Sequence, residues 1–172
     1  GKVVLVTSAN PDSGKTFITL NLGMSMALAN VKVVILDLDL RKGSLSKSVG
    51  IGMKKTGVSN YLSGKVDDVK ELVQVCGDDN RLHIITSGAL PPNPAELLKS
   101  GRLDRLLGEL KKNYDYILLD NPPYGVVVDT QLCGRLADQT VYVVRSGLFD
   151  KRMLPELQEL YDSGKMKNMS IL

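Results

Sequence analysis

The sequence predicts an α/β fold, a doubly wound and mainly parallel sheet with helices on both faces. Short apolar runs bounded by turn residues recur along the chain, and helical patterns separate them. The runs are continuously apolar, as in strands that are buried on both faces. The 172 residues, 43% of them hydrophobic and 24% charged, suit one globular domain with a sizeable core. We therefore expect a single domain over residues 1–172.

The apolar runs give the expected strands, which are residues 3–7, 31–37, 82–86, 116–120 and 140–145. Spacings of three and four between apolar residues predict helices over 15–29, 95–111 and 154–161. Each helix groups its apolar residues on one face: Phe17, Leu20, Met24 and Leu28; then Leu98, Leu103, Leu106, Leu107 and Leu110; then Leu154, Leu157, Leu160 and Tyr161.

Residues 43–80 are less regular, and we expect short helices near 57–63 and 66–75. The prolines of residues 91–94 are expected to end a strand and to start the helix at Ala95. Both ends of the chain are expected to be cut, because it opens on a strand and closes on the strand-like "MSIL". We therefore expect a domain excised from a longer protein.

The bulk properties exclude some classes of function. A formal charge of +3 and few aromatic residues do not point to a nucleic-acid partner. No apolar run approaches the ~20 residues that span a bilayer, and we expect no signal peptide. We expect a soluble, cytoplasmic chain.

Residues 8–22, "SANPDSGKTFITLNL", place a loop ending in Gly-Lys-Thr between a strand and an amphipathic helix. This context predicts a phosphate-binding loop, whose backbone N–H groups from Asp12 to Thr16 converge on a β-phosphate. Lys15 is expected to reach the β- and γ-phosphates, and the Thr16 hydroxyl to ligate Mg²⁺. The alternative is an incidental strand–turn–helix with a solvated lysine. The expected nucleotide-binding residues are Asn10, Pro11, Asp12, Ser13, Gly14, Lys15, Thr16 and Phe17.

Three aspartates end two of the expected strands. Asp37 and Asp39 close "VVILDLD", and Asp120 closes "YILLD". Ligands of doubly wound sheets bind at the carboxyl ends of the strands, where the phosphate loop also lies. We expect Asp120 to hold Mg²⁺ and Asp37 or Asp39 to approach the metal or an incoming hydroxyl, the alternative for both being a helix cap or a salt bridge with Arg41. The expected metal ligands are Thr16, Asp37 and Asp120, and the expected catalytic residues are Lys15, Asp37, Asp39 and Asp120.

Three motifs thus stand in order: the phosphate loop, Asp-x-Asp-x-Arg at 37–41, and "YDYILLDNPP" at 114–123. Together with "GALPPNPAELLKSGRLDRLL" at 88–107 and "TGVSNYLSGK" at 56–65, they resemble bacterial tyrosine kinases (BY-kinases), which control capsule and exopolysaccharide assembly. The resemblance covers nearly the whole chain. It implies a P-loop NTPase-like fold and transfer of the ATP γ-phosphoryl group to tyrosine, usually on the protein itself.

The resemblance also implies cofactors and partners. The cofactors are ATP and Mg²⁺, and the partners are ATP or ADP, a tyrosine-containing acceptor and a membrane polysaccharide co-polymerase. The domain would lie at the inner face of the bacterial membrane, through a fused or separate transmembrane part. The family's ring-forming motif and tyrosine cluster are not found in this sequence, so we expect a homo-oligomer only of the full-length protein.

Roles for single residues follow from the same resemblance. A carboxylate such as Asp37 is expected to accept the tyrosine proton. Arg41 and Arg145 either contact phosphate or acceptor or lie at the surface, and His83 lies too far inside a strand for a catalytic base.

The chain departs from the family pattern in its loops. The related septum-site and partition ATPases carry a signature lysine where this chain has Asn10, which favours the kinases. Asp12 stands where the kinases usually have glycine, and Asn121 where threonine is common. Two alternatives therefore remain beside the kinase: a partition-type switch ATPase, and a nucleotide-binding scaffold of polysaccharide export without transfer activity.

Overall fold

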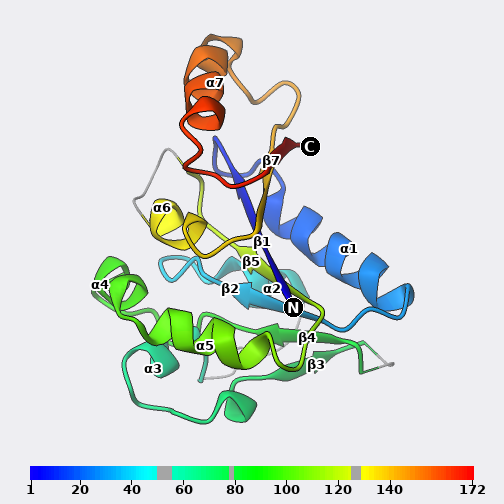
Figure 1. Ribbon diagram of the computed structural model, residues 1–172, viewed down its shortest axis with the longest axis vertical. Helices are drawn as coiled ribbons and strands as arrows, with labels where there is room; N and C mark the ends of the chain where they lie inside the picture. The colour runs from blue at the N-terminus through cyan, green and yellow to red at the C-terminus, as the bar shows by residue number, and fades with distance from the viewer. Residues whose placement is uncertain (50–55, 78–79, 125–128) are drawn as a thin grey trace.

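The computed structural model describes residues 1–49, 56–77, 80–124 and 129–172 (Figure 1). The described strands form one seven-stranded sheet in the order β3-β4-β2-β5-β1-β6-β7. Neighbouring strands are parallel except β3 and β4, which are antiparallel. The predicted α/β class is confirmed. The strands are β1 Lys2–Ser8, β2 Val33–Asp37, β3 Gln74–Cys76, β4 Leu82–Ile85, β5 Tyr116–Asp120, β6 Gln139–Val143 and β7 Met169–Ile171.

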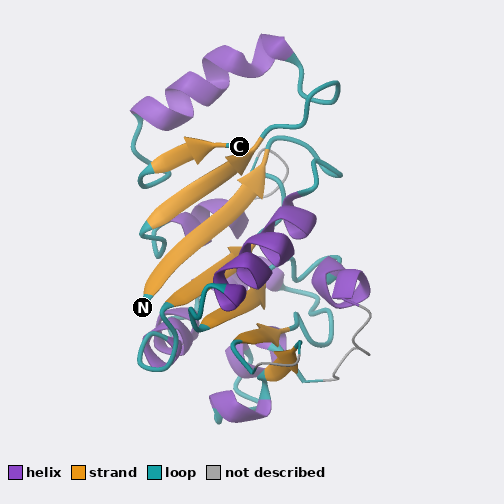
Figure 2. Ribbon diagram, turned by 90° about the vertical axis from the view of Figure 1, so that its right-hand side faces the viewer, coloured by secondary structure: helices purple, strands orange, loops and turns teal. Residues whose placement is uncertain are grey.

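Helices cover both faces of the sheet, as Figure 2 shows. Side chains alternate across each strand, so Val33 and Ile35 of β2 belong to a buried cluster with residues of α1 and α2, whereas Val34 and Leu36 belong to a second cluster on the opposite face, with residues of the remaining helices. The described helices are α1 Lys15–Leu28, α2 Ser44–Val49, α3 Val58–Leu62, α4 Pro94–Lys99, α5 Arg102–Leu110, α6 Asp129–Gly134 and α7 Leu154–Asp162. Two 3₁₀ turns are η1 Val69–Glu71 and η2 Lys151–Met153.

The sequence patterns located most of these elements, but some boundaries were wrong. The helix expected over 95–111 is two helices, because Ser100 takes an extended conformation with ψ 122° between α4 and α5. The region expected to be helical over 66–75 holds η1 and the start of β3 instead. Residues 50–55 and 78–79 of the less regular region lie outside the described residues. No helix within the described ranges is both long and apolar enough to cross a membrane.

The buried face of α1 is not the apolar face that the sequence pattern groups together. Phe17 and Leu28 are 67% and 75% exposed, whereas the buried residues of the helix are Lys15, Thr19, Gly23 and Ala27. A Cβ on Gly23 would lie 2.9 Å from the Ile35 side chain, so the small face lets the helix approach the sheet closely. Close approach rather than side-chain size decides which face is buried.

This packing predicts opposite effects for two substitutions in α1. We expect Gly23→Leu to destabilise the protein by about 1–3 kcal/mol, because the new side chain overpacks the contact with β2. Leu28→Gln should change the free energy of unfolding by less than about 0.5 kcal/mol, because Leu28 faces solvent. Urea denaturation of both variants tests this, and an equal loss in Leu28→Gln would contradict the assignment of the buried face.

Candidate nucleotide-binding site

The loop between β1 and α1 is shaped by its own hydrogen bonds. The hydroxyls of Ser8 and Ser13 both donate to the carbonyl oxygen of Asn10, at 2.7 and 2.8 Å. Asp12 and Gly14 have positive φ values of 58° and 89°, a conformation that glycine adopts without strain and that aspartate tolerates better than most residues. Because α1 begins directly after Gly14, its unpaired N–H groups and the positive end of its dipole face this loop.

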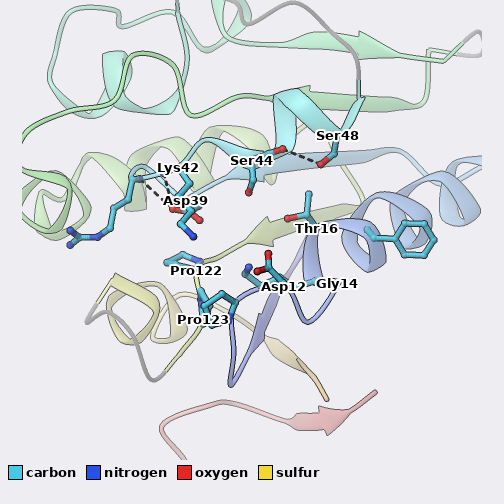
Figure 3. Close-up of a pocket in the computed structure, with 13 residues that line it drawn as sticks. Asp12, Gly14, Thr16, Asp39, Lys42, Ser44, Ser48, Pro122 and Pro123 are labelled. Carbon is cyan, nitrogen blue, oxygen red and sulfur yellow. Dashed lines mark hydrogen bonds between the residues drawn. The ribbon is translucent and has the colours of Figure 1, made fainter. Parts of the chain in front are cut away.

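A cavity of about 360 Å³ lies beside the loop. Its walls are the phosphate loop with the start of α1, residues 39–48 after β2, and two prolines after β5. Figure 3 shows Thr16 and Gly14 toward one side of this cavity, and Asp39 and Lys42 toward the other. Three segments that are distant in the sequence therefore enclose one space at the carboxyl ends of parallel strands, as expected for a doubly wound sheet.

Most of the predicted nucleotide-binding residues line this cavity. Those that do are Pro11, Asp12, Gly14, Lys15, Thr16 and Phe17. Ser13 is only 7% exposed, and its hydroxyl is engaged by the Asn10 carbonyl. The side-chain oxygen of Asn10 is buried and has no hydrogen-bond partner in the described part of the chain. Asn10 and Ser13 thus support the loop from behind, and the sequence pattern does not separate these supporting residues from the lining ones.

The buried Asp120 contacts Thr16, a residue of the cavity wall. The Thr16 hydroxyl donates to Asp120 Oδ2 at 2.8 Å, while Asp120 Oδ1 is buried with no partner in the described structure. Burial raises the pKa of Asp120 to about 6, against the lowering effects of the Thr16 hydrogen bond and the Lys15 charge. A buried carboxylate oxygen without a donor, beside a threonine hydroxyl, fits the oxygen ligands that Mg²⁺ takes together with nucleotide phosphates.

No three His, Cys, Asp or Glu side chains in the described ranges are grouped so as to hold a metal by themselves. At nucleotide sites, Mg²⁺ generally uses one or two carboxylates and completes its shell with phosphate oxygens and water.

Asp37 has a different place from the one expected. It lies opposite Asp120 in the β2–β5 pairing but is fully buried, and its two oxygens accept the backbone N–H groups of Asp39 at 3.1 Å and Leu45 at 3.2 Å. Burial, and next the Asp120 charge, raise its pKa to about 8. Asp37 therefore caps the start of α2 and does not line the cavity. The expectation that it accepts the tyrosine proton is not supported by this geometry.

Asp39 is the acid of this segment that lines the cavity. Its Oδ1 accepts the backbone N–H groups of Arg41 at 3.3 Å and Lys42 at 3.1 Å, which closes a tight turn after β2. The alternative of a salt bridge between Arg41 and these aspartates is wrong, because Arg41 pairs with Asp129 at 2.8 Å. Asp129 is a charged residue that the sequence reasoning missed, since it matches no motif there.

Arg145 contacts the phosphate loop, whereas His83 does not line the cavity. Arg145 Nη1 donates to the carbonyl oxygen of Asp12 at 3.0 Å, so it supports the phosphate loop from the end of β6. The His83 ring contacts the Tyr114 hydroxyl at 2.6 Å and Asn80 at 2.9 Å, inside the β4 region. As expected, His83 lies apart from the cavity.

Comparison with known proteins places this site in a defined class, the AAA domain, whose family model matches residues 1–162. The tyrosine-protein kinase CpsD of Streptococcus pneumoniae serotype 4 is 33% identical over 166 residues, which are 96% of this chain and 72% of CpsD. The kinase domain of the Escherichia coli tyrosine kinase Etk has a TM-score of 0.89 and 34% identity, over 99% of this chain and 66% of that one. The chain belongs to the family of bacterial tyrosine-protein kinases within the AAA domains, which confirms the resemblance.

The chain spans only part of some relatives. It covers 22% of full-length Etk of Escherichia coli K12, at 36% identity over 163 residues. The septum site-determining protein MinD of Pyrococcus horikoshii shares the fold at a TM-score of 0.77, with 20% sequence identity. That likeness concerns the fold alone.

The raised pKa values of Asp37 and Asp120 lead to a prediction of how the stability of the protein depends on pH. Because folding raises the pKa of Asp37 and Asp120 above the usual aspartate value, the folded state holds protons that the unfolded chain has already released. Stability of the metal-free protein is therefore expected to fall as the pH rises from about 4 to 8. Thermal denaturation between pH 5 and pH 8 measures this slope.

Asp37→Asn should flatten the slope, whereas the exposed Asp162→Asn should leave it unchanged. Mg²⁺ should raise the melting temperature more at pH 8 than at pH 6, because it binds carboxylates that have lost their protons. An undiminished slope in Asp37→Asn would show that Asp37 is not the group responsible.

Proposed function

We propose that this chain is an ATP-dependent kinase domain that transfers the γ-phosphoryl group to protein tyrosine. The observation that carries the proposal is the 2.8 Å contact of Asp120 with Thr16, which lines the cavity, together with Asp39 in the far wall of that cavity. Phosphate binding, metal binding and an acid for the acceptor thus share one space. Membership of the tyrosine-protein kinase family supports this assignment.

In this proposal, most of the electrostatic stabilisation of the phosphates comes from the phosphate loop. Its backbone N–H groups and the α1 N-terminus hold the β-phosphate, and Lys15 spreads positive charge over the transferring group. Thr16 and Asp120 would hold Mg²⁺, which supplies charge neutralisation across the phosphates. Lys15 is only 9% exposed, so its charge acts in a partly desolvated site where it is less screened than in water.

Asp39 is the acid best placed to take the proton of the acceptor. It lines the cavity, while both oxygens of Asp37 are engaged by backbone N–H groups. A tyrosine hydroxyl has a pKa of about 10, so a nearby carboxylate assists proton removal as transfer proceeds. We assign proton acceptance to Asp39 and support of the β2–α2 loop to Asp37.

The wider setting is proposed on the same family membership. The acceptor would be a tyrosine-containing protein, including the kinase itself, and the full-length protein would assemble as a homo-oligomer. Coupling to a membrane polysaccharide co-polymerase would place the domain at the cytoplasmic face of the membrane.

Phosphotransfer should depend on Lys15. The protein incubated with ATP, Mg²⁺ and a tyrosine copolymer should yield phosphotyrosine, and Lys15→Met should lose at least about 99% of it, because a major stabiliser of the transferring charge is removed. Lys99→Met, an exposed lysine of α4, is the matched control. Phosphate release without phosphotyrosine would instead identify a switch ATPase.

A second candidate is a nucleotide-binding scaffold without transfer, and Asp12 is the observation that favours it. This exposed acid lines the phosphate cavity, so its carboxylate repels a bound nucleotide. At an effective dielectric near 20, the repulsion at ~8–10 Å is roughly 1–2 kcal/mol, less when solvated. Tight nucleotide binding with neither phosphotyrosine nor phosphate release would support the scaffold.

Removing the Asp12 charge should tighten nucleotide binding. We expect Asp12→Gly and Asp12→Asn each to lower the Kd for ATP about fivefold at low salt, with the gain shrinking as salt is added. Asparagine also tolerates positive φ, so the pair of variants separates charge from backbone freedom. Isothermal titration measures the affinities, and weaker binding in both variants would reverse the proposed sign.

A further inference from the structure

Asp129 is a buried charge whose partner among the described residues is Arg41. Its side chain is 1% exposed, while that of Arg41 is 45% exposed. Arg41 Nε donates to Asp129 Oδ2 at 2.8 Å, and Nη2 donates to Oδ1 at 3.3 Å. A buried carboxylate is costly without such a partner, and two parallel hydrogen bonds fix the plane and direction of the guanidinium. Asp129 thus holds the head of Arg41 in one orientation.

Arg41 has N–H donors that Asp129 does not engage. A guanidinium carries five N–H donors, and Asp129 engages Nε and one Nη2 hydrogen. Arg41 and the following Lys42 both line the phosphate cavity, and the ion pairs found among the described residues do not include Lys42. Two cations therefore line the same wall as Asp39, and among the described residues neither Arg41 Nη1 nor the Lys42 ammonium has a hydrogen-bond partner.

This wall is where an acceptor must arrive. The nucleotide phosphates are served by the loop, Lys15 and Thr16, and the attacking group approaches the γ-phosphoryl group in line with the leaving oxygen. Figure 3 shows Asp39 and Lys42 across the cavity from Gly14 and Thr16. On the proposed function, Lys42 therefore lies on the side of the cavity from which the acceptor approaches, and Arg41 lines the same wall.

We propose that Arg41, oriented by Asp129, binds a carboxylate of an acidic acceptor segment, and that Asp129 is a positioning residue. The substrate class is a polypeptide with aspartate or glutamate beside the tyrosine. This inference rests on the proposed kinase function and names the acceptor of the same site. In this proposal Nε and one hydrogen of Nη2 of Arg41 bind Asp129, and the remaining guanidinium donors bind the substrate.

Peptide binding tests the proposal without requiring turnover. Fluorescence anisotropy compares labelled Glu-Glu-Tyr-Glu-Glu with Gln-Gln-Tyr-Gln-Gln on the protein loaded with Mg²⁺ and a non-hydrolysable ATP analogue. The unaltered protein should bind the acidic peptide about tenfold more tightly, the effect of one charge-assisted hydrogen-bonded pair. Arg41→Gln should abolish that preference, and Asp129→Asn should reduce it severalfold.

The double variant Arg41→Gln/Asp129→Asn guards against misfolding, because it leaves a neutral amide pair in place of an unpaired buried acid. It should bind no more weakly than Arg41→Gln, since Asp129 acts through Arg41. Arg135→Gln/Asp104→Asn is the matched control: it removes a surface pair whose two contacts are 3.0 and 2.8 Å, and it should leave the peptide preference unchanged.

Three results would overturn the proposal. They are equal affinity of the unaltered protein for both peptides, an unchanged preference in the double variant, and a loss confined to nucleotide affinity. Failure of phosphotyrosine formation with an intact acidic-peptide preference would count against the kinase function and not against this acceptor site. In a turnover assay, the double variant should raise the KM for an acidic copolymer about tenfold and that for ATP less than twofold.

Discussion

Two buried carboxylates side by side are the constraint on which the rest of the site depends. The parallel pairing of β2 with β5 places Asp37 opposite Asp120, and both are at most 1% exposed. Two neighbouring carboxylates that are both charged repel each other, and burial away from water disfavours the charged form of each one. The surrounding structure therefore supplies donors and positive charge: backbone N–H groups for Asp37, and Thr16 with Lys15 for Asp120.

Asp37 and Asp120 make different contacts because their surroundings differ. Asp120 contacts Thr16 at the start of α1, and its Oδ1 has no donor among the described residues. Asp37 faces the next segment of its own chain and uses both oxygens to hold the turn into α2. That turn presents Asp39 to the cavity. Asp37 and Asp120 are thus neighbours in the sheet and the same residue type, yet they contact different parts of the chain.

The position of the phosphate loop depends on packing contacts that lie outside the loop itself. Gly23 lets α1 lie close to β2, and the register of β1 with β5 sets where the loop leaves the sheet. Arg145 reaches the loop from β6 through the Asp12 carbonyl. The loop is therefore supported from both flanking strands as well as from its own serine hydroxyls, which suits a site that must present several N–H groups at fixed positions.

The fold class, the phosphate loop and the family were predictable from the sequence, because each rests on local patterns. Continuous apolar runs predict buried parallel strands, and Gly-Lys-Thr between a strand and a helix predicts a phosphate loop wherever the chain folds. The same reasoning failed on α1, where apolar spacing pointed to Phe17 and Leu28, which face solvent. The spacing of apolar residues along a helix shows which residues share a face. It does not show how closely that face approaches a sheet.

Only the tertiary structure decided the roles of the charged residues. Asp37, Asp39 and Asp120 look alike as acids at strand ends, yet one caps a turn, one lines the cavity and one meets Thr16. The pairing of Arg41 with Asp129 joins residues 88 positions apart in the chain, and no local pattern connects them. The physical reason is that burial and hydrogen-bond partners come from segments distant in sequence. A motif can place an acid at the end of a strand, but the fold determines what that acid touches.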